Sequence, residues 1–264
     1  MLRLIACDID GTLIPYGTRE LPEGVFPRIR RLRERGVLFC PASGRQYHSL
    51  RQLFAPVADE LCFLCENGAA VYGPGPEETA PLLSRTVMPR GDALGLARAI
   101  LSRPDAQVLI SGANTSYVCR CSPTLRRDLE ERLHNRVRAV DAPEEIGEEI
   151  IKVSAFCPAG TAAPEAALRE PWGTRFSMAV AGPTWLDFTL ADKGAGIRGL
   201  CDALQISLAD VMAFGDNWND LPMLERVGYP VWMRSAPAEL LDRFPRRCDS
   251  VLEELDRLEK EAAL

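Results

Sequence analysis

The feature that most constrains the fold is a pair of carboxylates directly after an apolar run near the N-terminus. The segment "LRLIACDIDGTLI" covers residues 2–14, and five of the six residues from Leu2 to Cys7 are apolar. Such a run is typical of a buried strand. Asp8 and Asp10 follow at once, and two like charges this close are costly to bury unless a cation compensates them. We therefore expect a strand that delivers two acids to a cation-containing site.

Strands and helices alternate along the first part of the chain. Apolar runs at residues 37–43 and 61–65 predict two further strands, and the segments at about 22–35 and 45–53 predict helices between them. This alternation indicates a parallel sheet with right-handed crossovers.

The middle of the chain has a different pattern of predicted elements, with short strands such as "AQVLISG" and "IIKVSAFC" between amphipathic helices. The first pattern then resumes with a helix at 193–204 and the strand "DVMAFG". We expect an α/β fold in which residues 1–81 and 187–264 form a Rossmann-like parallel-sheet core and residues 82–186 form an inserted α/β cap domain.

Composition narrows the possible partners. The net charge is −6, which does not favour nucleic acid as a partner. No apolar run is long enough for a membrane span, and no signal-peptide cleavage pattern follows the first strand, so we expect no membrane partner and a cytoplasmic location. The nine cysteines are scattered without a secretory signal, so buried reduced thiols are expected. No oligomeric state follows from the sequence.

Lysine is rare in this chain. Of 31 basic residues only Lys152, Lys193 and Lys260 are lysines. A compact ammonium is therefore of interest wherever it is retained. Lys193 opens a predicted helix, where the helix dipole disfavours a cation, so a functional role is favoured there. Lys152 lies on a predicted strand of the middle segment, where a solvated lysine is the ordinary expectation and a substrate contact the alternative.

Most of the polar and charged residues that could form one binding site lie where predicted strands end or a predicted helix begins. The carboxyl ends of parallel strands meet at one edge of a sheet, where ligands bind in open α/β folds. The first strand, the strand "VLFCPAS", the helix of "ADKGAGI" and the strand "DVMAFG" supply the following residues: Asp8, Asp10, Thr12, Ser43, Gly44, Arg45, Lys193, Asp216, Asn219 and Asp220.

This inventory suits a phosphate monoester. Three or more carboxylates indicate Mg²⁺, which takes oxygen ligands. The Ser43 hydroxyl, the Lys193 ammonium and backbone amides after a glycine are suited to hold phosphate oxygens. Mg²⁺ and Lys193 would together offset the clustered aspartates.

A carboxylate nucleophile is the solution that remains for phosphoryl transfer. The chain has two histidines, no G-x-S-x-G motif and no Walker A sequence. Asp8, at the strand end, would attack phosphorus and form an aspartyl-phosphate. Asp10 would protonate the leaving oxygen and later activate the water that hydrolyses the intermediate.

The motifs "DIDGT", "SGR", "KG" and "GDNWND", in this order, resemble those of the haloacid dehalogenase superfamily. The insertion after the third predicted strand, together with "ENGA" at Glu66–Ala69, is similar to the Cof-type, IIB-capped phosphatases of that superfamily. This resemblance covers the whole chain, the core motifs being specific and the cap similar in topology.

The resemblance implies a role for each matching position. Asp8 would be nucleophile and Mg²⁺ ligand, Asp10 acid/base and a ligand through its backbone carbonyl, and Asp216 a further ligand. Asp220 would brace the metal's waters or Lys193 without binding the metal directly. Residues implied or expected to bind phosphate or substrate are Thr12, Ser43, Gly44, Arg45, Asn67, Asn219 and Lys193. Arg45 binds phosphate or pairs with an acid. Asp192 stands where the family usually has serine.

We therefore expect Mg²⁺-dependent hydrolysis of a small phosphorylated metabolite through an Asp8-phosphate. A phosphomutase, or a specialised sugar-phosphate phosphatase of the same superfamily, is the alternative. A phospho-accepting receiver module also combines aspartates, Mg²⁺ and lysine, but such modules are about half this length and lack both "GDNWND" and an insertion.

Overall fold

The computed structural model describes residues 1–16, 18 and 20–260. The chain forms two compact units. The core unit comprises Met1–Arg45, Leu50–Arg85 and Asp192–Leu264, and the inserted unit comprises Gln46–Ser49 and Thr86–Ala191.

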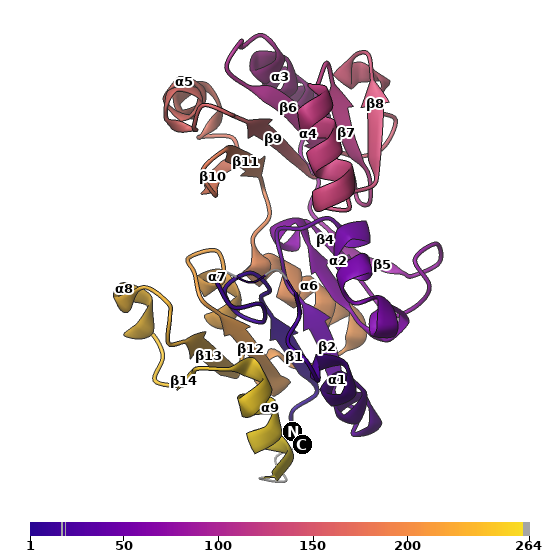
Figure 1. Ribbon diagram of the computed structural model, residues 1–264, viewed down its shortest axis with the longest axis vertical. Coiled ribbons are helices and arrows are strands. Elements are labelled where there is room, and N and C mark those ends of the chain that lie inside the picture. The colour runs from indigo at the N-terminus through magenta and orange to yellow at the C-terminus, as the bar shows by residue number, and fades with distance from the viewer. Residues whose placement is uncertain (17, 19, 261–264) are drawn as a thin grey trace. The chain divides into compact units, whose positions relative to one another are not determined.

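The core unit is built on a five-stranded parallel sheet (Figure 1). Its strand order is β14-β13-β12-β1-β2, so the first strand lies near the middle, between strands from opposite ends of the chain. All four residues of β1 are buried, as expected for a parallel strand covered on both faces. The strands are β1 (Leu4–Cys7), β2 (Leu38–Pro41), β12 (Val211–Gly215), β13 (Tyr229–Met233) and β14 (Arg247–Cys248).

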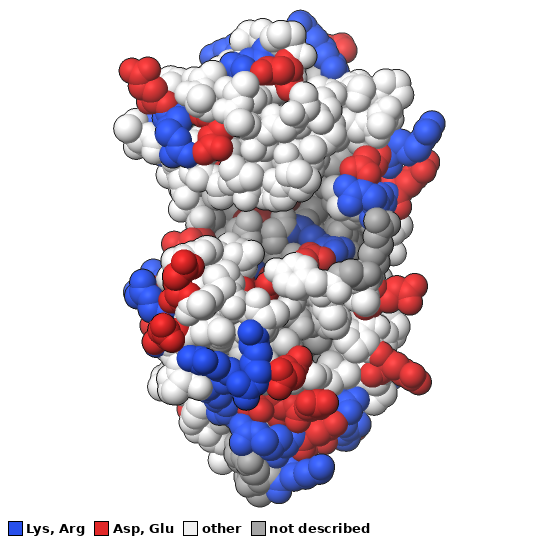
Figure 2. Space-filling model, turned by 60° about the vertical axis from the view of Figure 1, so that its left-hand side comes forward, with Lys and Arg blue, Asp and Glu red and all other residues white. Residues whose placement is uncertain are grey.

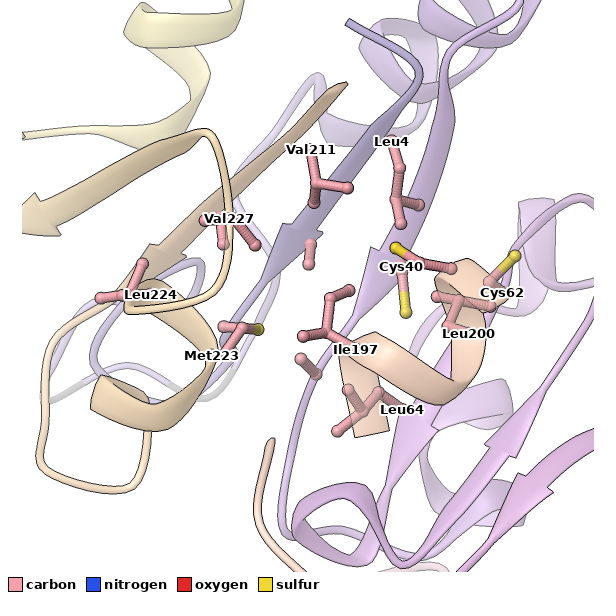
Figure 3. Packing of buried hydrophobic residues seen from close by; sticks show 14 of the residues in the cluster. Leu4, Cys40, Cys62, Leu64, Ile197, Leu200, Val211, Met223, Leu224 and Val227 are labelled. Carbon is pink, nitrogen blue, oxygen red and sulfur yellow. The ribbon is translucent and has the colours of Figure 1, made fainter. Parts of the chain in front are cut away.

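Helices cover this sheet with their apolar sides. Figure 3 shows the cluster in which Ile197 and Leu200 of α6 meet Leu4 of β1 and Val211 of β12. All nine cysteines are free thiols and eight are buried, in agreement with the prediction of reduced core cysteines. The helices of the core unit are α1 (Val25–Glu34), α2 (Tyr47–Leu53, shared with the inserted unit), α6 (Lys193–Leu204), α7 (Leu221–Leu224), α8 (Ala238–Leu241) and α9 (Val251–Lys260).

The arginine-rich outer side of α1 is paired with acids. Arg28 contacts Asp256 of α9 at 2.5 Å, and Arg31 contacts Glu259 of α9 at 3.1 Å. Figure 2 shows basic and acidic side chains intermixed at the end of the core unit that carries α1 and α9. The basic run at residues 28–35 therefore forms the charged, outward side of an amphipathic helix.

A second, antiparallel sheet in the core unit differs from the sequence prediction. Strand β3 (Phe63–Cys65) was expected in the parallel sheet, but it pairs with β4 (Ala70–Tyr72), which pairs with β5 (Leu82–Arg85). A parallel bridge between Ala42 and Leu64, with hydrogen bonds from the amide of Cys62 to the carbonyl of Phe39 and from the amide of Ser43 to the carbonyl of Leu64, still places this segment beside β2. The apolar run at 61–65 correctly predicted a buried strand. Its antiparallel partner is β4, with which it forms a hairpin.

The turn between β3 and β4 holds three consecutive residues with positive φ. Glu66, Asn67 and Gly68 have φ of 50°, 54° and 95°. A Cβ on Gly68 would lie 2.3 Å from the carbonyl oxygen of Asp192, so only glycine allows the turn to approach the start of α6. This close packing fixes Asn67 beside the helix that Lys193 opens.

The inserted unit has a six-stranded sheet of order β10-β11-β9-β6-β7-β8, antiparallel except between β7 and β8. Apolar residues of α3 and α5 pack on one face of it. The elements are β6 (Gln107–Ser111), β7 (Ser116–Cys119), β8 (Val137–Val140), β9 (Lys152–Phe156), β10 (Ser177–Ala181), β11 (Trp185–Thr189), α3 (Arg90–Leu101), α4 (Pro123–Arg127) and α5 (Ala162–Trp172).

The predicted insertion at residues 82–186 begins and ends earlier than this unit. Strand β5 is held in the core unit by its pairing with β4, and β11 is held in the inserted unit by its pairing with β9. Lys152, for which a solvated side chain was the ordinary expectation, is buried and lies 3.5 Å from Asp187. No helix within residues 1–16, 18 and 20–260 has the length and apolarity needed to cross a membrane.

Candidate active site

The carboxyl ends of β1 and β12 place two aspartates side by side. The strands pair in parallel, with Cys7 opposite Phe214, and the amide of Asp8 donates to the carbonyl of Phe214 at 3.1 Å. Asp8 and Asp216 thus leave neighbouring strands at the same edge of the sheet, as the positions of the motifs predicted. Both side chains are buried.

Lys193 brings a cation to this edge from the first turn of α6. Asp192 caps the helix by accepting the amide of Ala195 at 2.7 Å, so the residue that replaces the family's usual serine performs an N-cap function. The Lys193 ammonium lies 2.5 Å from Oδ1 of Asp8 and 2.6 Å from Oδ1 of Asp220. Its side chain has no solvent exposure.

Asp220 connects the lysine with the loop that carries Asp216. Its second oxygen, Oδ2, accepts the backbone amides of Asp216 and Asn217 at 3.0 Å each. One carboxylate thereby orients the Lys193 ammonium and shapes the "GDNWND" loop. Of the two alternatives for Asp220, the structure places it on Lys193.

Two hydroxyl groups hold the carboxylate of Asp216. Thr12 donates to Oδ1 at 2.9 Å, and Tyr16 donates to Oδ2. The Thr12 side chain is therefore committed to Asp216, and its predicted role at the phosphate stays a prediction. The Asp216 hydrogen bond also raises the pKa of Tyr16 well above its usual range.

The three buried aspartates form one cluster. One oxygen from each of Asp8, Asp216 and Asp220 can be chosen so that all lie within 4.8 Å of one another. Burial, and then repulsion from Asp220, raise the pKa of Asp8 to about 8, although Lys193 opposes the rise. Burial alone would lower the pKa of Lys193, but attraction to Asp220 and Asp8 raises it above its usual value.

This donor set fits a hard divalent cation. When all three carboxylates are ionised, they and the one ammonium leave two negative charges in a buried site, and all available donors of the cluster are oxygens. Mg²⁺ combines that charge and ligand preference. The cluster therefore agrees chemically with the predicted cofactor.

Asp10 lies outside this cluster, and its side chain is 58% exposed. Arg45 holds it with two hydrogen bonds, from Nε to Oδ2 at 3.0 Å and from Nη2 to Oδ1 at 2.6 Å. Of the two roles considered for Arg45, the structure therefore displays pairing with an acid, and that acid is the predicted proton donor. The predicted metal contact of Asp10 involves its backbone carbonyl, which the side-chain cluster does not test.

The remaining predicted residues border this set in the core unit. Ser43 is buried, and its Oγ accepts the amide of Arg45 at 3.3 Å. Asn219 donates to Oδ1 of Asn67 at 3.4 Å, and a Cβ on Gly44 would lie 3.1 Å from Nδ2 of Asn67. The structure thus brings Asn67 together with both Gly44 and Asn219.

Tyr16 is the site residue that sequence reasoning missed. Its contact with Asp216 spans 200 positions of the chain, and no motif marks it. Its one available signal was its position six residues after Asp10, within the segment that leaves the acidic motif.

Known proteins are similar to this chain in sequence and in fold. A profile of haloacid dehalogenase-like hydrolases matches residues 5–252. The 5-amino-6-(5-phospho-D-ribitylamino)uracil phosphatase YbjI of Escherichia coli is 26% identical, with 99% of this chain and 98% of that protein covered. An HMP-PP phosphatase of Cronobacter sakazakii is 27% identical, with 93% and 89% covered.

Solved structures agree over nearly the full length. A crystal structure of a Eubacterium rectale protein has a TM-score of 0.85 at 25% identity, with 97% of this chain and 99% of that one covered. The subclass IIB sugar phosphatase BT4131 of the haloacid dehalogenase superfamily has a TM-score of 0.78 at 19% identity, with 99% and 100% covered. The predicted fold class, a parallel-sheet α/β core with an inserted α/β unit, is confirmed.

Proposed function

Because this chain belongs to the haloacid dehalogenase-like hydrolases, we propose that it hydrolyses a small phosphomonoester through an aspartyl-phosphate on Asp8. Its relatives are phosphatases, and a phosphorylated small molecule is the substrate class. The main support for this proposal is the buried Asp8 at the end of β1, held by the ammonium of Lys193 within the carboxylate cluster.

The first chemical step would use the oxygen that Lys193 leaves available. The lysine binds Oδ1 of Asp8, so Oδ2 attacks phosphorus while the bond from phosphorus to the leaving oxygen breaks. Asp10 first parts from Arg45 and takes up a proton from solvent; it then gives that proton to the leaving oxygen, and the alcohol departs. The exposed position of Asp10 outside the carboxylate cluster supports this role, because a proton donor must reach the leaving group rather than the metal.

The second step would restore the enzyme. Asp10, now ionised, takes a proton from water, whose oxygen attacks the phosphorus of the Asp8-phosphate. The bond between phosphorus and Asp8 breaks, and inorganic phosphate leaves. Arg45 would hold the Asp10 carboxylate in place between the two steps.

Mg²⁺ is the proposed cofactor, held by Asp8, Asp216 and the backbone carbonyl of Asp10. When bound it would neutralise charge on the transferring phosphoryl group. Lys193 and Ser43 would bind phosphoryl oxygens, Asp220 would orient Lys193, and Asn67 and Asn219 would border the substrate. A cytoplasmic location, expected because the sequence shows neither a membrane-length apolar run nor a signal-peptide pattern, stays a prediction.

Phosphate release from a panel of sugar, nucleotide and cofactor phosphates tests this proposal. Wild type and Asp8→Asn would be assayed with Mg²⁺ and with a chelator. We expect release that requires both Mg²⁺ and Asp8, with at least about a 10³-fold loss in the variant. Equal release by the purified variant would contradict the mechanism. Return of the phosphoryl group to a second hydroxyl, without phosphate release, would identify a phosphomutase instead.

A further inference from the structure

Asp216 differs from the other acids of the site in how its charge is compensated. Lys193 contacts both Asp8 and Asp220, and Arg45 contacts Asp10. Among the residues that the structure describes, no basic side chain pairs with Asp216, although it is buried. Its two oxygens instead accept hydroxyl groups, from Thr12 and from Tyr16. Hydroxyls orient a carboxylate without neutralising it, so this acid keeps its charge for another cation.

The Tyr16 contact is closely fitted. A Cβ on Gly11 would lie 2.5 Å from Oδ2 of Asp216 and 2.7 Å from Cζ of Tyr16. Gly11 also has a φ of 99°, a conformation that glycine adopts at little cost. The missing side chain at position 11 therefore gives the phenol room to reach the carboxylate.

The hydroxyl is the part of Tyr16 with a defined partner. The residue as a whole is 66% exposed, so core packing does not explain why a large aromatic side chain is placed here. A hydroxyl donor occupies one lone pair of Oδ2 and leaves the oxygen another for a cation. Hydrogen bonds of this kind to metal-binding carboxylates fix their orientation and raise metal affinity.

We propose that Tyr16 is a positioning residue of the cation site, whose hydroxyl, together with that of Thr12, holds Asp216 in the orientation that a divalent cation requires. This inference rests on the proposed function in one respect, since it takes the carboxylate cluster to be the cation site. Tyr16 acts through Asp216 and takes no part in bond making or breaking.

Mg²⁺ binding to the substrate-free protein tests the inference directly. Titration calorimetry on Tyr16→Phe, which keeps the ring and removes the hydroxyl, should show Mg²⁺ affinity about 10- to 100-fold weaker than wild type. Tyr229→Phe is the matched control, because Tyr229 is a partly exposed tyrosine of the core unit away from the carboxylate cluster; its affinity should equal that of wild type. Unchanged or tighter binding by Tyr16→Phe would overturn the proposal.

The dependence of kcat on Mg²⁺ concentration gives a second test, because a merely structural role of Tyr16 would not change it. For Tyr16→Phe, raising the Mg²⁺ concentration should restore kcat to near the wild-type value, whereas loss of a catalytic group would persist at saturating metal. Thermal melting in chelator should show only a small loss for Tyr16→Phe, because the ring is kept and a single hydrogen bond is removed.

Failure of the inference and failure of the proposed function are distinguishable. If wild type binds Mg²⁺ and releases phosphate, and Tyr16→Phe binds Mg²⁺ with equal affinity, only the role of Tyr16 is overturned. Wild type that binds no Mg²⁺ at this cluster overturns the cation site and the role of Tyr16 together.

Discussion

Lys193 and Asp220 form an ion pair at 2.6 Å in which both side chains are completely buried. The pair persists in the interior because each partner has further contacts: Lys193 also binds Asp8, and Asp220 accepts two backbone amides. Buried ions are costly unless every group is compensated in this way. The nucleophile, the lysine and the "GDNWND" loop therefore depend on one another for their positions.

Replacing Lys193 should destabilise the protein strongly. Lys193→Met leaves the buried carboxyl groups of Asp8 and Asp220 without their ammonium, and we expect a loss of about 3–5 kcal/mol in the free energy of unfolding at neutral pH without metal. Urea denaturation measures this. Lys260→Met is the control, because Lys260 lies exposed at the end of α9, and its replacement should change stability by less than about 0.5 kcal/mol. Similar stability of the two variants would contradict the coupled arrangement.

Mg²⁺ affinity should rise with pH. The pKa of Asp8 is raised to about 8 by burial and by repulsion from Asp220, above its value in the unfolded chain, so the metal-free folded protein holds this proton across the neutral range. Without metal, the contribution of Asp8 to stability is present at low pH and is lost as pH rises through the folded pKa. A cation must displace the proton, so affinity should increase by up to about tenfold per pH unit between pH 6 and 8.

Calorimetry in buffers of different ionisation enthalpy would count the proton released on Mg²⁺ binding. Asp8→Asn has no proton to displace, and its residual Mg²⁺ binding should show no such slope. Wild-type affinity that is independent of pH over this range would contradict the assignment of the raised pKa.

Arg45 should affect turnover and leave metal binding intact. It clamps Asp10, whose side chain lies outside the carboxylate cluster, so Arg45→Ala should release the proton donor from its position. We expect kcat to fall by about 10- to 100-fold, part of what general acid–base catalysis supplies, with unchanged Mg²⁺ affinity. Arg28→Ala is the control, because Arg28 makes an analogous two-point contact with Asp256 away from the site. Wild-type turnover by Arg45→Ala would argue against this positioning role.

Gly68→Ala should be far more disruptive than Gly36→Ala. Both glycines have positive φ, 95° and 78°, but a Cβ at position 68 would lie 2.3 Å from the Asp192 carbonyl, whereas nothing lies within 4 Å at position 36. Gly36→Ala should cost about 1 kcal/mol from backbone strain, and Gly68→Ala should cost several times more. Chemical denaturation of both variants checks this, and equal losses would exclude the clash as the cause.

The sequence predicted the features that follow from strand ends. The apolar runs before Asp8 and Asp216 specified two buried parallel strands, and parallel strands necessarily present their carboxyl ends at one edge. The motif order then supplied Lys193 and Asp220 through the family resemblance. These residues are indeed in contact, although their catalytic roles stay predictions.

The pairing partners of strands and the long-range contacts of side chains were harder to predict from the sequence. A short apolar strand such as β3 does not encode whether its main partner is parallel or antiparallel, so its pairing with β4 was not predicted, although a parallel bridge does place it beside β2. The unit boundaries depend on the same kind of pairing, by β5 and β11. The contacts of Tyr16 with Asp216 and of Arg45 with Asp10 depend on side-chain geometry, which leaves no periodic signal.

The pairing of β1 with β12 has a consequence for synthesis. Leu4 pairs with Val211, so the strand that carries the proposed nucleophile leaves the ribosome long before its central neighbour exists. During translation Asp8 has neither Lys193 nor Asp216 beside it, whereas nearly all of the inserted unit, Thr86–Ala191, is one continuous stretch that is complete earlier. A partly made chain therefore lacks the carboxylate cluster. We expect reactivity toward phosphate esters to appear only once the last third of the chain has joined the sheet.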